Sequence, residues 1–230
     1  MEVLQVPFNV KAEDVFRKMR LNKSNERIES LVRELLEKAK PVARPKALYT
    51  VAYVENKNGD TLTINGVKFN SHVLRVNLDK VERVFPYIVT CGKEMDEMPI
   101  PANDLMESYC FDAIKEVAVE QARSYMQEYL IKTYALGQIS RIAPGSGSAE
   151  DWPITQQKQL FSLFGDVEKL IGIKLTDSCL MIPIKSVSGI LFPTEIKFES
   201  CQLCPREHCV GRRAPYNPEL VKKYKPAGSS

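Results

Sequence analysis

The sequence predicts an α+β protein in which long helices pack on a twisted antiparallel sheet. Apolar residues recur at helical spacing in two long segments, at about 24–40 and 103–134. Short β-branched and aromatic stretches separated by Asn- and Gly-containing turns lie between them, the pattern of antiparallel hairpins. Because these strands follow one another through tight turns, the pattern disfavours a βαβ repeat.

The two predicted helices have residues at their ends that start or stop helices. Ser24 can cap the first, and Pro41 and Pro45 end it. Gly137 ends the second, and a third, shorter helix is predicted over 156–164. The second helix carries an apolar stripe of Met106, Tyr109, Cys110, Ala113, Val117, Gln121, Tyr125 and Met126. The predicted strands are 47–55, 61–64, 67–69, 80–91, 173–175, 179–183 and 189–192.

Charge and cysteine are concentrated at the C-terminus. Residues 201–230 hold six Lys or Arg against two Glu and three of the six cysteines, whereas residues 1–200 hold 26 basic and 27 acidic groups. We therefore predict three parts: an N-terminal helical segment over 1–45, packed on a main domain over 46–200, and a cysteine-containing basic tail over 201–230.

Composition and motifs exclude several classes of protein. The chain is 44% hydrophobic and 27% charged, which is ordinary for a globular protein and excludes overall disorder. No stretch reaches the roughly 20 apolar residues of a spanning helix, and the N-terminus lacks signal-peptide character, so we expect a cytoplasmic protein with reduced thiols and no membrane contact.

Hydrolytic catalysis is disfavoured because the expected relay residues are scarce. The chain has no dinucleotide or phosphate-binding glycine motif and no nucleophile elbow. Its two histidines are His72 and His208. We interpret His72, which lies among strand-forming residues, as structural or solvated.

The segment 141–147 is a candidate ligand-binding loop. Gly145 and Gly147 have no Cβ, so backbone amides there can approach a ligand closely. Arg141, four residues before Gly145, can bind a carboxylate through two hydrogen bonds. The alternative is a solvent-exposed Gly/Ser turn that carries a surface arginine.

The second predicted helix carries a row of acids. Asp112, Glu116 and Glu120 recur every four residues and therefore share one face. Such a row is usually a solvated face. If one carboxylate contacts a ligand, Glu116 is best placed, because it lies between the predicted core positions Ala113 and Val117.

Cys201, Cys204 and Cys209 are candidate metal ligands. A C-x2-C pair puts two thiolates on one turn, as in zinc and iron–sulfur sites, and Cys209 can complete three corners. The fourth ligand would be His208 or a distant thiol (Cys91, Cys110 or Cys179). The alternative is a group of reduced or redox-active thiols.

The C-terminal motif leaves two rival functions open. A metal-stabilised module could bind a protein or a nucleic acid, although the basic residues are few for nucleic acid. A metal or iron–sulfur module could also transfer electrons.

Residues 105–192 resemble the activation domain of cobalamin-dependent methionine synthase, which binds S-adenosylmethionine. The most specific run is 167–178, followed by Met181, Pro183 and the S-V-S-G turn at 186–189. The R-x-A-x-G motif of the family corresponds to Arg141, Ala143 and Gly145, and its A-E-A-F-A-E motif is similar to residues 115–120. The chain differs from the family in Ser146, which replaces an aromatic residue, in a longer loop, in lacking the paired tyrosines and in its cysteine-rich tail. It also has no cobalamin-binding D-x-H-x-x-G segment.

The resemblance implies a function and a set of contacts. Arg141 would bind the carboxylate of S-adenosylmethionine, backbone groups at Ala143 and Gly145 would hold its adenosyl part, and Glu116 would face a polar group. The chain would act as a stand-alone reactivation subunit in the reductive methylation of cob(II)alamin. Cobalamin would be held by the partner, a cobalamin-dependent methionine synthase or another corrinoid protein, and a flavodoxin or ferredoxin would supply the electron.

Overall fold

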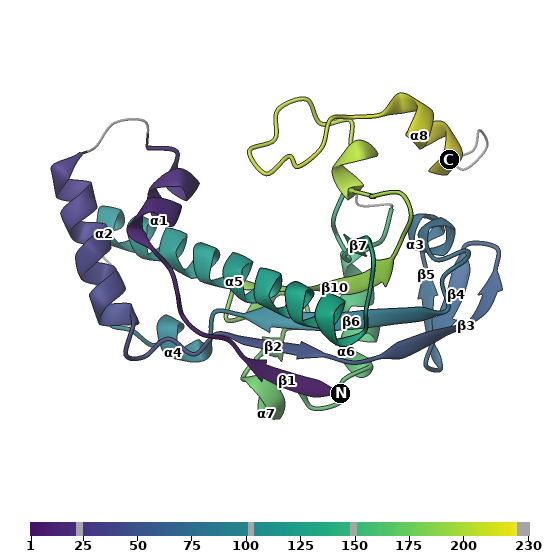
Figure 1. The fold of residues 1–230 in the computed structure, drawn as a ribbon, viewed down its shortest axis with the longest axis horizontal. Helices are drawn as coiled ribbons and strands as arrows, with labels where there is room; N and C mark the ends of the chain where they lie inside the picture. Colours follow the sequence, from purple (N-terminus) through teal and green to yellow (C-terminus); the bar gives the residue numbers. More distant parts are fainter. Residues whose placement is uncertain (22–24, 101–103, 148–150, 225–230) are drawn as a thin grey trace.

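The computed structural model describes residues 1–21, 25–100, 104–147 and 151–224, and within these ranges its centre is an eight-stranded antiparallel sheet (Figure 1). Its strands are β1 (Glu2–Gln5), β2 (Lys46–Tyr49), β3 (Ala52–Asn58), β4 (Thr61–Ile64), β5 (Val67–Asn70), β6 (Arg83–Thr90), β7 (Ile139–Ile142) and β10 (Ser186–Pro193). β8 (Lys174–Leu175) and β9 (Met181–Ile182) pair separately.

Strand β6 organises the sheet. One edge of β6 pairs with β10, from Thr90 opposite Ser186 to Phe85 opposite Leu191. The other edge pairs with β2 and then with β3. β1 extends the sheet beyond β2, and β7 extends it beyond β10. This mixture of helices and antiparallel strands confirms the predicted α+β class.

The prediction of a single strand over 47–55 is wrong, because the chain forms β2 and β3 there. β2 pairs with residues 87–90 of β6, and β3 pairs with residues 83 and 84. Pro86 lies between these two ladders and has no amide N–H to donate, although its carbonyl accepts a hydrogen bond from the Thr50 amide at 3.1 Å. The pairing is therefore interrupted at residues 50 and 51.

The helices are α1 (Ala12–Met19), α2 (Glu26–Ala39), α3 (His72–Asn77), α4 (Lys93–Asp96), α5 (Leu105–Thr133), α6 (Gln157–Ser162), α7 (Val167–Ile171) and α8 (Pro218–Tyr224), with 3-10 turns η1 (Ile154–Gln156) and η2 (Ser200–Gln202). α2 and α5 confirm the two long predicted helices, and η1 with α6 occupies the predicted short one. In the described parts of the chain, no helix is long and apolar enough to cross a membrane.

Side-chain caps fix the starts of both long helices. The predicted cap Ser24 and the predicted first residue Asn103 lie outside the described residues. Asn25 caps α2, since its side chain accepts hydrogen bonds from the amides of the second and third helical residues. Asp104 caps α5 in the same way.

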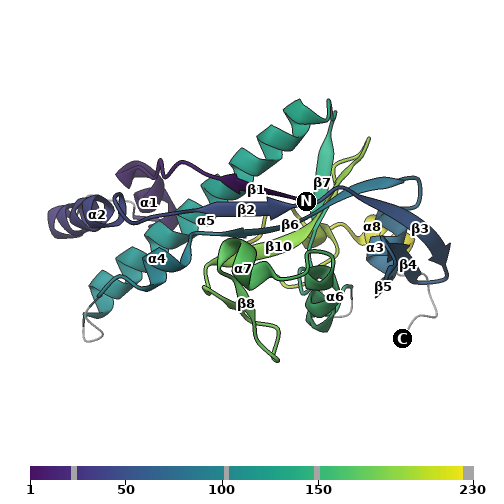
Figure 2. The same cartoon turned by 90° about the horizontal axis from the view of Figure 1, so that it is seen from below.

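Helices cover both faces of the sheet (Figures 1 and 2). Alternate strand residues point to opposite faces. Tyr49 and Tyr87 therefore pack in the core that contains α1, α2 and α5, whereas Leu48 and Ile88 pack in the core that contains α6 and α7. Because α5 is enclosed by the sheet on one side and by α1 and α2 on another, its buried surface is broader than a single stripe.

The predicted apolar stripe on α5 is therefore only partly correct. Cys110, Ala113, Val117 and Met126 are buried, but Met106, Tyr109 and Tyr125 are exposed. Ile114 and Ala118, which are not in the predicted stripe, are also buried.

His72 follows strand-forming residues in the sequence, but in the structure it is the first residue of α3. Ser71 caps this helix, and its hydroxyl accepts a hydrogen bond from the Leu74 amide at 2.9 Å. The Ser71 cap favours a helix over residues 72–77, although the intrinsic propensities of the neighbouring residues favour a strand. His72 is half-buried, and its Nδ1 lies 2.6 Å from Asp60 Oδ1.

The segments on either side of the predicted main domain pack against it. β1 joins the main sheet, and α1 and α2 pack on α5. After residue 200, Leu203 is buried, and Tyr224 of α8 stacks on Phe198 with ring centroids 5.3 Å apart. The described part of the basic tail is therefore built into the fold.

Candidate functional site

The strands β7 and β10, the loop after β7 and the start of α6 enclose a pocket of about 240 Å³. We call it the arginine pocket, because Arg123, Arg141 and Arg213 all line it. The remaining lining residues are Tyr87, Ile142, Ala143, Pro144, Ser146, Ile154, Gln157, Met181, Ser186, Val187 and Ser188. The S-V-S-G and R-x-A-x-G motifs thus meet at one site.

Arg141 lies in a strand, so the prediction that the loop begins at this residue is wrong. β7 pairs with β10, and Arg141 is opposite Leu191. The guanidinium is half-buried, and within the described ranges it forms no hydrogen bond or ion pair. Burial and the nearby Arg123 cation lower the pKa of Arg141. Since an arginine stays charged in proteins, the pocket holds a cation without a bonded counter-charge.

Gly145 and Gly147, in the loop after β7, adopt backbone conformations that favour glycine. Gly145 has φ +75°, which other residues rarely adopt, and its amide donates to the carbonyl of Trp152 at 2.7 Å. Gly147 has φ +90°, and a Cβ there would lie 2.9 Å from Asp151 Oδ2. Ala143 lines the arginine pocket, whereas Gly145 lies beside it and is not among the lining residues.

The predicted S-V-S-G turn at 186–189 is wrong, because these residues form the start of β10, in which Gly189 allows the strand to approach its neighbours closely. A Cβ at this position would lie 2.6 Å from the carbonyl oxygen of Ile142 and 3.0 Å from the hydroxyl of Tyr87. Both neighbours border the arginine pocket. The glycine is therefore needed to position the two strands that form the pocket.

Gly189→Ala is expected to lower the free energy of unfolding by about 1–3 kcal/mol, because backbone must move to accept the methyl group. Urea denaturation would measure this loss. Gly137→Ala is the matched control, since a Cβ at Gly137 meets nothing within 4 Å. Equal stability of the two variants would contradict the close approach described at Gly189.

Glu116 lies away from Arg141, in a groove between α1 and α5 of about 950 Å³. Lys18 Nζ of α1 lies 2.6 Å from Glu116 and 2.7 Å from Glu120. Burial alone would lower the pKa of Lys18, but hydrogen bonds to these two carboxylates outweigh it and raise the pKa. Arg123 lines both the groove and the arginine pocket, so the two hollows are neighbours.

Asp112, the first residue of the acidic row on α5, also forms ion pairs. Asp112 forms ion pairs with Lys115 and Lys185 at 3.2 and 3.4 Å. The row thus takes part in ion pairs that connect α5 to its neighbours. The structure brings Arg141 and Ala143 together at one pocket and places Glu116 in the adjoining groove.

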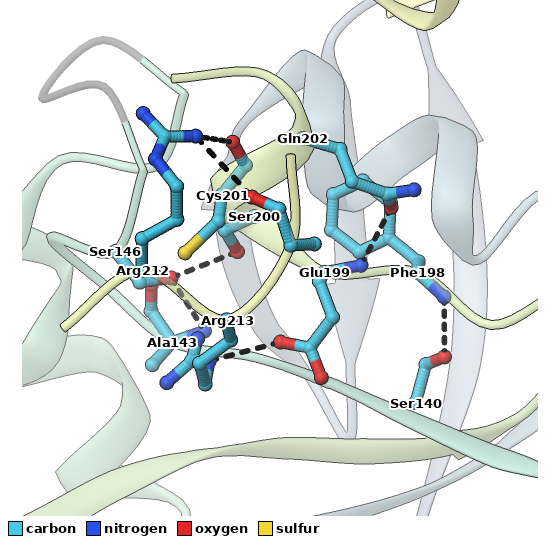
Figure 3. A network of polar contacts seen from close by, with 11 residues as sticks. Ser140, Ala143, Ser146, Phe198, Glu199, Ser200, Cys201, Gln202, Arg212 and Arg213 are labelled. Atoms are coloured by element: carbon cyan, nitrogen blue, oxygen red, sulfur yellow. Dashed lines mark hydrogen bonds and ion pairs between the residues drawn. The ribbon is translucent and has the colours of Figure 1, made fainter. Parts of the chain in front are cut away.

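The segment after β10 is bonded to the loop that carries the site (Figure 3). The Ser146 hydroxyl lies 3.1 Å from that of Ser200, and the Phe198 amide donates to Ser140 Oγ at 2.8 Å. Arg213 Nε lies 3.0 Å from Glu199 Oε2. Through Arg213, a segment that the sequence presented as a tail supplies part of the pocket lining.

The candidate metal ligands Cys201 and Cys204 lie on one turn, in which the Cys204 amide donates to the Cys201 carbonyl at 3.3 Å. The guanidinium of Arg212 donates to the backbone carbonyls of Cys201 and Cys204, at 3.2 and 3.3 Å. It also donates to the backbone carbonyl of Arg206. In the described ranges, no group of three or more His, Cys, Asp or Glu is arranged to hold a metal ion. The metal assignment of Cys201, Cys204 and Cys209 stays a prediction.

The six thiols are expected to divide into two reactivity classes. Cys209 is exposed and Cys201 and Cys204 are half-buried, whereas Cys91, Cys110 and Cys179 are buried. Burial raises the pKa of Cys91 to about 12, which leaves little reactive thiolate at pH 8.

Iodoacetamide at pH 8 should therefore modify the three C-terminal cysteines in the native protein and the other three only in denaturant. Peptide mass spectrometry would locate the labels. Cys209→Ser should remove one label from the native pattern. Labelling of Cys91 without denaturant would contradict the structure.

Four polar lining residues were missed in the sequence: Tyr87, Arg123, Gln157 and Arg213. They come from β6, α5, α6 and the segment after η2, and none belongs to a local motif. Their contribution depends on contacts between distant parts of the chain. Arg123 follows Glu116 by two helical turns and therefore lies on the same helix face. This spacing was the one signal in the sequence that could have indicated Arg123 as a site residue.

Comparisons with known proteins agree with the fold and with the motifs. Residues 113–200 match the family model described as the activation domain of vitamin B12 dependent methionine synthase. The predicted resemblance to this activation domain is confirmed. The matched segment contains Glu116, Arg141, Ala143 and Gly145, and it ends before the three C-terminal cysteines.

A solved structure shares the fold over most of the chain. It is the reactivation domain of MetH bound to AdoHcy, with a TM-score of 0.61 and 16% identity, and the match covers 86% of this chain and 80% of that one. At this identity the likeness establishes the activation-domain fold. A comparison with curated proteins gave no match.

Proposed function

We propose that this chain binds S-adenosylmethionine at the arginine pocket and serves as the reactivation component of a cobalamin-dependent methionine synthase or a related corrinoid protein. The observation that carries the proposal is Arg141, a half-buried cation with no bonded partner among the described residues. It lies in the segment that matches the activation-domain family, and the solved relative holds AdoHcy, which shares the amino-acid carboxylate of S-adenosylmethionine.

The distribution of charge supports one orientation of the ligand. The arginine pocket contains three arginines, of which Arg213 pairs with Glu199. The adjoining groove contains Glu116, Glu120 and Glu128 together with several cations. A ligand with a carboxylate at one end would place it near Arg141 and Arg123. Lys18 binds Oε1 of Glu116, and the second carboxylate oxygen of this half-exposed side chain could accept a hydrogen bond from the ligand.

The site has the features needed for positioning. When bound, S-adenosylmethionine would supply a methyl group on a sulfonium, and the reduced cobalamin of the partner would be the acceptor substrate. The residues of this chain need to bind the ligand, orient it and leave the methyl group accessible, so none has to act as a general base. This requirement is consistent with the scarcity of histidines in the chain.

An apolar rim beside the pocket fits the docking of a partner. Leu180, Ile182 and Ile184 are exposed, and Met181 between the first two lines the arginine pocket. Exposed apolar side chains gathered in one place are typical of protein contacts. We place the corrinoid protein on this side, where its cobalt could reach the bound ligand.

The proposal is tested by transfer of a labelled methyl group. The protein is mixed without oxygen with S-adenosylmethionine labelled at the methyl group, a cob(II)alamin-loaded methionine synthase fragment and titanium(III) citrate, which replaces the electron donor. Label should appear in methylcobalamin with the wild-type chain and with Arg33→Ala, whose side chain is exposed on α2. Transfer by Arg141→Ala at the wild-type rate would contradict the proposal.

A further inference from the structure

We propose that Gln157 is a ligand-binding residue of the arginine pocket and that its carboxamide recognises the adenine ring. Gln157 is the first residue of α6, it is one of the residues that line the pocket, and it is 3% exposed. Its Nε2 is buried and has no hydrogen-bond partner in the described structure. The inference rests on the proposed function, because it names a contact to the nucleoside part of the same ligand.

A buried amide without a partner is unusual. Folding removes the amide N–H groups from water, and without a new acceptor that loss is uncompensated. The great majority of buried side-chain polar atoms in proteins therefore have a partner. An exception that borders a pocket indicates a group whose acceptor arrives with a ligand.

The preceding residue shows what a structural glutamine looks like at this place in the fold. Gln156 is also buried, at 9% exposure, and its Oε1 accepts a hydrogen bond from the Asn70 amide at 2.8 Å. Its Nε2 donates to the Asn70 carbonyl. Both ends of the Gln156 amide thus connect η1 to β5, whereas the neighbouring Gln157 amide connects no elements in the described structure.

The other pocket walls indicate the chemistry of the missing acceptor. The pocket that Gln157 lines also has apolar surface, which suits a flat heteroaromatic ring. This surface comes from Pro144, Ile154, Met181 and Val187. A carboxamide offers a donor and an acceptor side by side, and adenine has the complementary pair in its 6-amino group and an adjacent ring nitrogen. The arginines bordering the same pocket remain available for the carboxylate.

Gln157→Met tests the inference, since methionine keeps the length of the side chain and removes its donors. Its affinity for S-adenosylhomocysteine, measured by calorimetry, should fall at least ~10-fold, and the melting temperature without ligand should stay the same or rise. Gln156→Met is the matched control. It should melt at a lower temperature and bind S-adenosylhomocysteine with unchanged affinity.

Fragments of the ligand identify the contact. Adenosine should bind the Gln157→Met protein more weakly than it binds wild type, whereas the affinity for methionine should not change. Unchanged affinity of Gln157→Met for S-adenosylhomocysteine would overturn the inference, as would a loss confined to methionine or a lower melting temperature. If wild type binds S-adenosylhomocysteine and Arg141→Ala weakens this binding while Gln157→Met does not, the proposed function stands and the role of Gln157 fails.

Discussion

Arg141→Ala should reduce the affinity for S-adenosylhomocysteine by about 10- to 150-fold and leave the unliganded protein at least as stable as wild type. Hydrogen bonds to charged groups contribute about 1.5–3 kcal/mol, and each 1.4 kcal/mol is a factor of ten in affinity. Stability should not fall, because no bonded partner of Arg141 is found in the described ranges and its burial in the pocket is unfavourable.

Calorimetry and thermal melting together check this expectation. Arg33→Ala is the control, because that arginine is exposed on α2 and lies 3.6 Å from Glu13, remote in sequence from the pocket residues. Arg141→Lys should recover only part of the affinity, since an ammonium group cannot form the paired hydrogen bonds of a guanidinium. A stable Arg141→Ala protein with wild-type affinity would show that the carboxylate binds elsewhere.

Trp152→Ala should lower the free energy of unfolding by about 3–5 kcal/mol, the range found when large buried aromatic residues are truncated. Trp152 has no exposed surface and packs edge-on against Phe69, with ring centroids 5.9 Å apart. Its carbonyl also accepts the hydrogen bond from the Gly145 amide. The variant should therefore lose core packing and loosen the loop beside the arginine pocket.

Urea denaturation followed by far-ultraviolet circular dichroism measures the effect of Trp152→Ala, because this is the one tryptophan in the sequence and its fluorescence is lost in the variant. Leu105→Ala, at a side chain that is 81% exposed, should change the free energy of unfolding by less than about 0.5 kcal/mol. A loss below about 1 kcal/mol in Trp152→Ala would contradict the packing described.

The long elements were predictable because their patterns are local. The helical spacing of apolar residues predicts the helices over 26–39 and 105–133. The turn residues between β3, β4 and β5 likewise predict the hairpins that connect these strands. Short elements were missed where tertiary contacts stabilise them. α1 has eight residues and is held by packing on α5, and β7 has four residues that pair with β10.

The candidate site was predictable only in part. Arg141 and Ala143 follow from a short motif, and the structure places both at the arginine pocket. Gln157 and Arg213 reach the same pocket from distant segments, which no spacing rule could reveal. Residue type alone also does not reveal the contacts of the basic residues after 200: the Arg212 guanidinium donates to the backbone carbonyls of Cys201 and Cys204.

Equilibrium dialysis of the wild-type chain against radiolabelled S-adenosylmethionine tests the central claim most directly. The structure predicts one saturable site per chain, competed by unlabelled S-adenosylhomocysteine and lost in Arg141→Ala. An absence of saturable binding at millimolar ligand, in a protein that melts cooperatively, would contradict the assignment of the arginine pocket to S-adenosylmethionine.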